Sequence, residues 1–325
     1  MRYRDWGERS TRWAGIRSTT VDVAGTSVHM LTADASADVP PEAPAQLLVH
    51  PMANGATMWL DVIRPLTAYG PVIAPDLPGA LFGHTESPHW AAPRAEPSAR
   101  FLRALISTLR LGPAVVHGWS MGGHVALRFA HLAPQHVERL VLMNPTLPGP
   151  LTMAERFGWQ TLGRLADSAG PAMARGTVRF WGSRTIEAKL RYVTDPEKLS
   201  TSAAEYSGGD PSRLAPENPM LWADQLRELQ SRPEKMAAAA TAFASVVSAM
   251  FIDRRPALEA IDGVDVPVLL LWGEHDPLIT RPVIDYVTGR RPDWALHVLQ
   301  TAGHIAPLEL PQAYADAVGL WLARG

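Results

Sequence analysis

Short apolar runs alternate along the chain with segments in which apolar residues recur at helical spacing. A run of about four to eight apolar residues between turn residues is typical of a buried strand, and a period near 3.6 is typical of an amphipathic helix. The runs predict strands at 18–23, 27–32, 46–50, 71–74, 114–116, 139–143, 266–272 and 295–299. The first two flank Ala24-Gly25-Thr26 and are expected to form a hairpin.

Helical spacing fills most of the gaps between these strands. It predicts helices at 56–69, 101–111, 125–132 and 312–322. Strands separated by helices favour an α/β fold, a mostly parallel doubly wound sheet with helices on both faces. The interval 146–255 breaks this alternation and contains helical patterns such as 220–230 and 233–252. We therefore predict an α/β core from 1–145 and 256–325, with 146–255 inserted as a helical cap.

Composition removes several classes of function. The 325 residues suit one large α/β domain with an insertion, and the net charge of −2 gives no attraction to nucleic acid. With no cysteine, disulfides, thiolate metal sites and a cysteine nucleophile are excluded, and we expect a cytoplasmic protein. No His-Glu-x-x-His spacing suggests a metal, and no cofactor is expected.

The ends and apolar runs of the chain give no sign of a membrane protein. No run approaches the roughly 20 apolar residues of a membrane helix, so we expect no stable membrane association. The basic start, which includes Trp6 and Trp13, is predicted to be a surface extension. The oligomeric state is left open by the sequence.

The motif Gly118-Trp119-Ser120-Met121-Gly122 lies between a predicted strand and a predicted helix. This is the G-x-S-x-G pattern in the context that a nucleophile turn requires. A sharp strand-to-helix turn would hold Ser120 in strained dihedrals, and side chains at 118 and 122 would meet neighbouring backbone. The following helix would begin beneath the hydroxyl, where its first amides favour negative charge.

A serine hydroxyl is a weak nucleophile without a base. Asp276 follows the strand 266–272, and His304 follows the strand 295–299. Both residues would therefore lie at the carboxyl ends of strands, where open α/β sheets bind ligands. We predict Ser120 as nucleophile, His304 as general base and Asp276 as the acid that orients the imidazole.

These motifs resemble those of the α/β-hydrolase family, in its serine-nucleophile group with a helical cap. Gly118–Gly123 is similar to the family's nucleophile elbow, 273–277 to its acid loop and 303–309 to its histidine loop. The resemblance implies an α/β-hydrolase fold from about residue 18 to the C-terminus. It also implies an oxyanion hole, with one amide from Met121 and another from the loop after Val49.

That loop departs from the family's usual His-Gly-x. It reads His50-Pro51-Met52, and proline has no N–H, so Met52 is the predicted second donor. For His50 we expect a role in holding the loop, with substrate contact as the alternative. Trp119 and Phe82 are further candidate substrate contacts, although Phe82 and its neighbour Leu81 are equally suited to packing their loop.

His117 and His124, on either side of the elbow, are expected to be structural. Several aromatic residues of the cap interval suggest an apolar pocket, among them Trp159, Phe180, Trp181 and Trp222.

The first hypothesis is a serine esterase that forms an acyl-enzyme on a small hydrophobic carboxylic ester. The second is carbon–carbon bond hydrolysis of a vinylogous diketone. Enzymes of that kind resemble this chain in Ser-Met-Gly-Gly but often carry tryptophan after the histidine, where Ile305 stands here. A thioesterase, lactonase, acyltransferase or perhydrolase would use the same three residues. A non-catalytic receptor on a hydrolase fold is the hypothesis of a different class, and the intact triad disfavours it.

Overall fold

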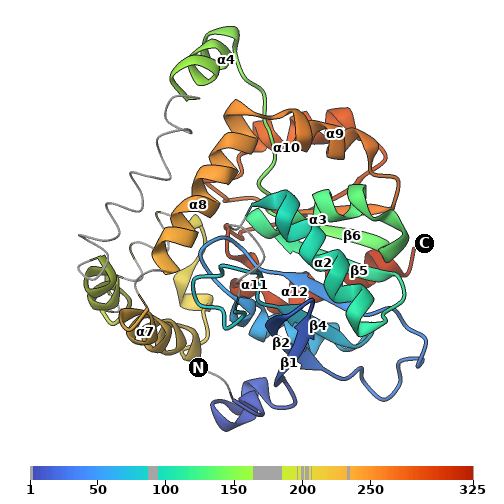
Figure 1. Ribbon diagram of the computed structural model, residues 1–325, viewed down its shortest axis with the longest axis vertical. Coiled ribbons are helices and arrows are strands. Elements are labelled where there is room, and N and C mark those ends of the chain that lie inside the picture. The colour runs from blue at the N-terminus through green and yellow to red at the C-terminus, as the bar shows by residue number, and fades with distance from the viewer. Residues whose placement is uncertain are drawn as a thin grey trace.

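A computed structural model describes residues 3–86, 94–163, 185–195, 197–198, 201, 205, 207–232 and 235–324. Its centre is an eight-stranded sheet with the order β1-β2-β4-β3-β5-β6-β7-β8 (Figure 1). The β1·β2 and β2·β4 pairs are antiparallel and all the other pairs are parallel. The strands are β1 (Arg17–Val23), β2 (Thr26–Ala33), β3 (Gln46–Val49), β4 (Val72–Pro75), β5 (Ala114–Trp119), β6 (Val137–Met143), β7 (Val268–Gly273) and β8 (Ala295–Leu299). The predicted fold class is confirmed.

Helices cover both faces of this sheet and bury separate apolar layers against it. One layer holds α2 (Ala95–Leu109), α3 (Met121–Leu132), α9 (Arg255–Gly263) and α10 (Arg281–Arg290). The other holds α1 (Leu60–Leu66), α11 (Ala306–Glu309) and α12 (Pro311–Leu322). Every residue of β5 and β7 is buried, because a parallel strand between two helical layers has no face in water.

The predicted hairpin is confirmed, and its turn is explained by backbone geometry. Val23 pairs with Thr26, so only Ala24 and Gly25 form the turn, and both have positive φ, 51° and 81°. A two-residue turn of that hand matches the right-handed twist of the two strands.

The described residues between 146 and 255 form helices and no strand. They include α4 (Met153–Gly158), which continues into a π-helical turn (Trp159–Gly163), and α7 (Glu217–Gln230). α8 (Lys235–Val247) likewise continues into a π-helical turn (Ser248–Ile252). Figure 1 shows α7 and α8 beside the core, with α4 at its edge. Phe180 and Trp181, two of the predicted cap aromatics, lie outside the described residues.

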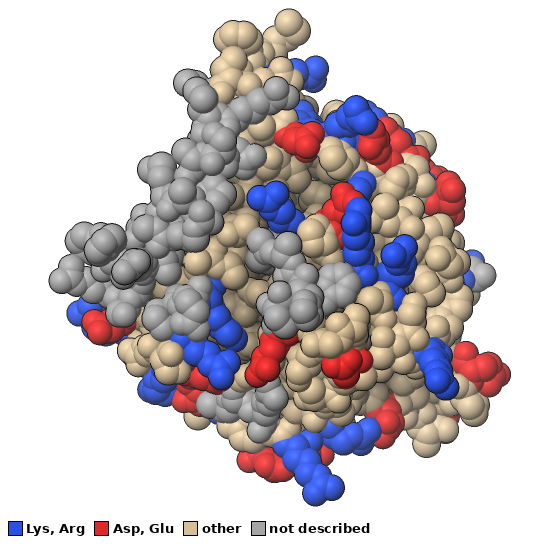
Figure 2. Space-filling view, viewed as in Figure 1, with Lys and Arg blue, Asp and Glu red and all other residues tan. Residues whose placement is uncertain are grey.

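The surface carries one feature that the sequence analysis did not anticipate. The helical stretch Lys235–Ile252 is long and apolar enough, by length and composition, to cross a membrane. The expectation that no run comes near this threshold was therefore wrong, although a single such helix does not by itself indicate a membrane. Elsewhere on the visible face, acidic and basic side chains are mixed (Figure 2).

The N-terminal segment is not the surface extension that we predicted. Trp6 and Trp13 are fully buried in the layer that also contains α1 and α12. The buried carboxylate of Asp61 accepts hydrogen bonds from Arg12 Nε at 2.7 Å and Trp13 Nε1 at 2.8 Å. Its other oxygen accepts from Asn218 Nδ2 of α7 at 2.8 Å. One buried group therefore joins the N-terminal segment, the core and the inserted interval.

Trp13→Ala should lower the free energy of unfolding by about 3–5 kcal/mol, because it leaves a large cavity and removes a donor from Asp61. Chemical denaturation of the full chain measures this loss. Leu320→Ala, at a side chain that is 61% exposed, is the control and should change stability by less than about 0.5 kcal/mol. Equal effects of the two substitutions would contradict the buried placement of Trp13.

Candidate active site

The turn between β5 and α3 holds Ser120 in the geometry that its glycines permit. Ser120 has φ 56° and ψ −120°, a strained combination for a residue with a Cβ. A Cβ on Gly118 would lie 2.4 Å from the Gly122 carbonyl oxygen, and one on Gly122 would lie 2.2 Å from that of Val49. Side chains at either position would therefore force the turn apart, and with it the serine.

Ser120, His304 and Asp276 meet in the predicted order of hydrogen bonds. His304 Nε2 lies 3.0 Å from Ser120 Oγ, and His304 Nδ1 lies 2.7 Å from Asp276 Oδ2. Because a carboxylate oxygen accepts, Nδ1 donates and Nε2 presents its lone pair to the serine hydroxyl. The arrangement can therefore remove the serine proton as the hydroxyl attacks an electrophile.

Two backbone amides fix the carboxylate of Asp276. Its Oδ1 accepts from the N–H groups of Leu278 at 2.8 Å and Ile279 at 3.0 Å, while Oδ2 faces the imidazole. The side chain is fully buried, whereas that of His304 is 12% exposed. The buried partner therefore orients the ring, and the ring keeps access to solvent.

Asn144 directly follows β6 and is a positioning residue that was not predicted from the sequence. It is fully buried and has φ 42°, a conformation that asparagine tolerates. Its Nδ2 donates to the carbonyls of Gly303 at 3.0 Å and His304 at 3.2 Å, and its Oδ1 accepts from Gly273 N–H at 2.8 Å. The side chain thus ties the histidine loop to the end of β7. A polar residue at the carboxyl end of a parallel strand was the available signal.

Trp119 does not occupy the place of the predicted substrate contact. It is 1% exposed and packs edge-on against Trp59, with ring centroids 5.6 Å apart. Its indole Nε1 donates to the His304 carbonyl at 2.9 Å. Because successive residues at the end of a strand point to opposite sides, the Trp119 side chain lies on the side opposite to the Ser120 hydroxyl. It supports the histidine loop from that side.

A segment of the predicted cap also contacts the histidine loop. The His304 N–H donates to the Ser207 carbonyl at 2.6 Å, and a Cβ on Gly303 would lie 2.1 Å from that same oxygen. Nearby, buried Glu309 accepts from Gly303 N–H at 3.1 Å. Burial raises the pKa of Glu309, and the hydrogen bond from Gly303 opposes this effect. The backbone of the general-base candidate is therefore held from the inserted interval as well as from the core.

The two predicted oxyanion donors lie on adjoining backbone segments. Met121 is the first residue of α3, so its N–H has no partner one turn earlier in the helix. The close approach of Gly122 to Val49 brings the start of α3 against the loop that carries Met52. Asn54 Nδ2 donates to the Met52 carbonyl at 3.0 Å and stabilises the turn, which includes Ala53 at φ 54°.

His50 holds this loop and uses both ring nitrogens to do so. Its Nε2 accepts from Leu77 N–H at 3.0 Å, so Nδ1 carries the hydrogen and donates to the Pro51 carbonyl at 2.8 Å. The residue is 1% exposed, and burial lowers its pKa, which favours the neutral ring. With both nitrogens engaged, His50 fits the loop-holding role and not the alternative of substrate contact.

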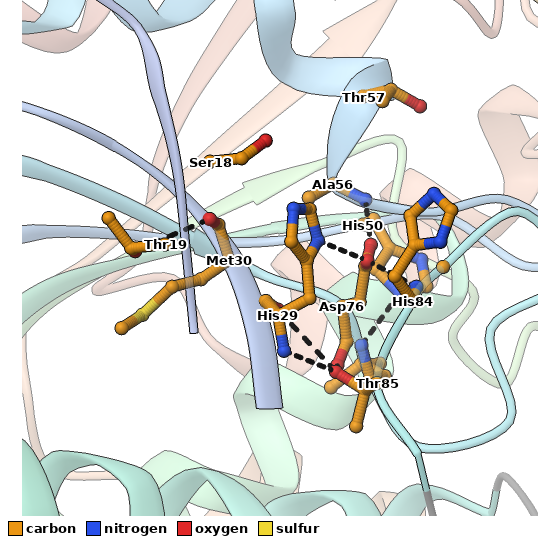
Figure 3. A network of polar contacts seen from close by, with 12 residues as sticks. Ser18, Thr19, His29, Met30, His50, Ala56, Thr57, Asp76, His84 and Thr85 are labelled. Atoms are coloured by element: carbon orange, nitrogen blue, oxygen red, sulfur yellow. Dashed lines mark hydrogen bonds and ion pairs between the residues drawn. The ribbon is translucent and has the colours of Figure 1, made fainter. Parts of the chain in front are cut away.

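Asp76 is the centre of the polar network behind this loop (Figure 3). Its Oδ1 accepts from Ala56 N–H, and its Oδ2 accepts from His29 Nδ1 and His84 N–H, each at 2.7 Å. Burial alone would raise the pKa of Asp76, but the hydrogen bonds from His29 and Ala56 lower it well below its usual range. Residues 50–56 are therefore fixed at their far end by a buried carboxylate.

Phe82 is half-buried among apolar residues and packs on the inserted interval. Its cluster includes Leu81 and, from α7, Leu226 and Leu229. This placement agrees with the loop-packing alternative, and substrate contact by Phe82 stays a prediction. Among the described residues, no group of three or more His, Asp or Glu side chains is arranged to hold a metal ion.

The fold and these motifs belong to one family. The model of the alpha/beta hydrolase family matches residues 46–317, so the chain is a member of it. Among solved structures, a serine hydrolase from Cycloclasticus zankles has a TM-score of 0.66 and 17% identity, and covers 95% of this chain and 98% of its own. The epoxide hydrolase CorEH has a TM-score of 0.68 at 20% identity, with 95% and 99% covered.

Several relatives align with most of this chain at 25–28% identity. An uncharacterized protein of Mycobacterium tuberculosis is 28% identical over 85% of this chain and 74% of its own. The 2-hydroxy-6-oxo-2,4-heptadienoate hydrolase of Pseudomonas putida is 26% identical, over 85% and 88%. The 2-hydroxy-6-oxononadienedioate/2-hydroxy-6-oxononatrienedioate hydrolase of Cupriavidus pinatubonensis is 25% identical, over 82% and 83%. The chain is therefore similar to hydrolases along most of its length.

Asn144→Gly keeps the left-handed backbone accessible and removes only the side-chain bonds to the two loops. A displaced imidazole should lower kcat on a chromogenic ester by about 100-fold with little change in KM. Ala24→Gly, at another positive-φ position far from the site, is the matched control and should leave kcat unchanged. An unaltered kcat in Asn144→Gly would show that the loops hold the histidine without it.

Asp76→Asn should lower the free energy of unfolding by about 3 kcal/mol at pH 7, because an amide cannot accept from all the donors around it. The pKa of Asp76 in the folded protein is well below its ordinary value, so its stabilising effect is complete at neutral pH. That effect is lost as the pH falls toward the folded pKa. Denaturation at several acidic pH values should show the gap between the two proteins narrowing; a gap independent of pH would contradict this origin.

Proposed function

We propose that the protein is a serine hydrolase that forms an acyl-enzyme on a small hydrophobic carboxylic ester. The observation that carries this proposal is the continuous hydrogen-bond chain from Ser120 through His304 to Asp276. Membership of a hydrolase family supports it, as does the apolar character of the inserted interval.

The proposed reaction begins when Ser120 Oγ attacks the ester carbonyl carbon and His304 Nε2 accepts the hydroxyl proton. The amides of Met121 and Met52 donate to the oxyanion, and Asp276 stabilises the imidazolium. The carbon–oxygen bond to the alcohol then breaks, and the imidazolium returns its proton to the leaving oxygen. Water, deprotonated by the same imidazole, attacks the acyl-enzyme and releases the acid and free Ser120.

Carbon–carbon bond hydrolysis is a second candidate because two relatives that align along most of the chain carry such names. On this alternative the same serine and histidine act on a vinylogous diketone. Comparing kcat/KM for a p-nitrophenyl ester and for a 2-hydroxy-6-oxo-dienoate, followed by loss of its absorbance, separates the two candidates. A preference for the dienoate would replace the ester proposal with the second one.

Ser120→Ala should reduce turnover of p-nitrophenyl butyrate by at least roughly 10⁴-fold and abolish labelling by a fluorophosphonate probe. The loss follows because the acyl intermediate of the proposed reaction forms on Ser120 Oγ. Ser107→Ala, at an exposed serine of α2, is the matched control and should keep full activity and labelling. Esterase activity that survives Ser120→Ala, or a wild-type protein that neither turns over esters nor takes the label, would contradict the proposal.

A further inference from the structure

A cleft of about 590 Å³ lies beside the candidate active site, between α2, α3, α8 and the start of α9. In Figure 2 the face is hollowed next to α8, and basic and acidic side chains stand around the hollow. The proposed reaction uses none of the residues that line this cleft. Its volume falls in the range of pockets that bind small organic molecules.

A second, small space, which we call the neck, adjoins the cleft at the start of α3. This space of about 10 Å³ is lined by Met121, Ala242 and Val246, and it shares Ala95, His124 and Ser245 with the cleft. Met121 also supplies the proposed oxyanion amide, so the neck borders a residue of the proposed oxyanion hole. The neck has room for about one water molecule. Four of its six lining residues are apolar, namely Ala95, Met121, Ala242 and Val246.

His124 links the two spaces and is available to a ligand. It lies on α3 one turn after Ser120 and is 3% exposed. No described residue is recorded as a hydrogen-bond partner of its ring, and His124 lines both the cleft and the neck. Burial, with a smaller effect of nearby Arg128, lowers the pKa of His124 to about 4, so the ring is neutral at pH 7.

The cleft is lined by more basic than acidic side chains. Three arginines, Arg94, Arg100 and Arg128, face two carboxylates, Glu96 and Asp253. Arg100 forms an ion pair with Glu96 at 2.6 Å. Among the described residues, Arg94 forms no ion pair.

Arg128 is 7% exposed and has donors to spare. It donates to the Pro256 carbonyl at 2.8 Å and lies 3.7 Å from Glu96, a distance beyond a good hydrogen bond. A guanidinium carries five N–H donors, so a carboxylate in the cleft would find unused ones.

We propose that this cleft receives the acyl chain of the substrate and that its arginines select a chain ending in a carboxylate. The inference rests on the proposed ester hydrolysis and specifies its substrate class. Methylene groups suit the apolar neck, with Val246 shifting to admit them. Arg128 follows Ser120 by eight residues, roughly 12 Å along the helix axis, which a medium-length acyl chain spans.

The test compares two p-nitrophenyl esters with acyl chains of equal length, the octanoate and the mono-ester of suberic acid. The wild-type protein should favour the suberate by about tenfold in kcat/KM at low ionic strength, and salt should reduce the preference. Arg94→Glu should abolish the preference, and Asp253→Asn should increase it. Arg103→Glu, the same charge change at an exposed position of α2 outside the cleft, should leave it unchanged.

Val246→Ala tests the neck separately. It should raise kcat/KM for both long-chain esters and leave p-nitrophenyl acetate unaffected, because an acetyl group does not reach the neck. For the charge variants of the cleft, Arg94→Glu and Asp253→Asn should shift the preference for the suberate ester in opposite directions. A general loss of stability would not produce such opposite shifts.

If wild-type protein hydrolyses both long esters equally, or if Arg94→Glu keeps the preference, the cleft proposal is wrong and the esterase proposal stands. If no ester is hydrolysed and Ser120 is not labelled, the proposed function itself fails.

Discussion

The candidate active site depends on a contact between two stretches of backbone, where the start of α3 meets the end of β3. The contact exists only because residue 122 has no side chain, since a Cβ there would lie 2.2 Å from the Val49 carbonyl oxygen. It brings the Ser120 hydroxyl, the first amide of α3 and the loop with Met52 to one place. Every chemical role that we propose for these groups requires that closeness.

Buried polar side chains then fix the loops that surround this contact. Asp76 holds the far end of the loop that carries Met52, and Asn144 joins the histidine loop to β7. Asp76 follows β4 and Asn144 follows β6, two strands with parallel partners, so both residues lie at the same end of the sheet. Their partners are mainly backbone groups, so they can orient a site without restricting which side chains the loops carry. The fold thus separates the positioning of the site from its specificity.

Local sequence patterns were sufficient to predict the sheet, most helices and the meeting of Ser120, His304 and Asp276. Each of those features depends on residue period or on strand ends that share one edge. The roles of Asn144 and Trp119 were missed because their acceptors are backbone carbonyls about 160 to 185 residues away. Only the place of Asn144 at the end of a parallel strand was a signal in the sequence. The burial of Trp6 and Trp13 was missed for a related reason: a basic segment that supplies tryptophans to a distant layer resembles a solvated tail.

The junction at Asp61 has a consequence for the order in which the molecule assembles. Ser10 bonds to Glu217, 207 positions further along, and Asn218 reaches Asp61 across 157. During synthesis the N-terminal segment emerges long before α7 is made. Until then its tryptophans are exposed or packed against the partly formed core. Contacts that join such remote parts of a chain form late and slowly. The final docking of α7 onto the N-terminal segment is therefore expected to limit the rate of maturation.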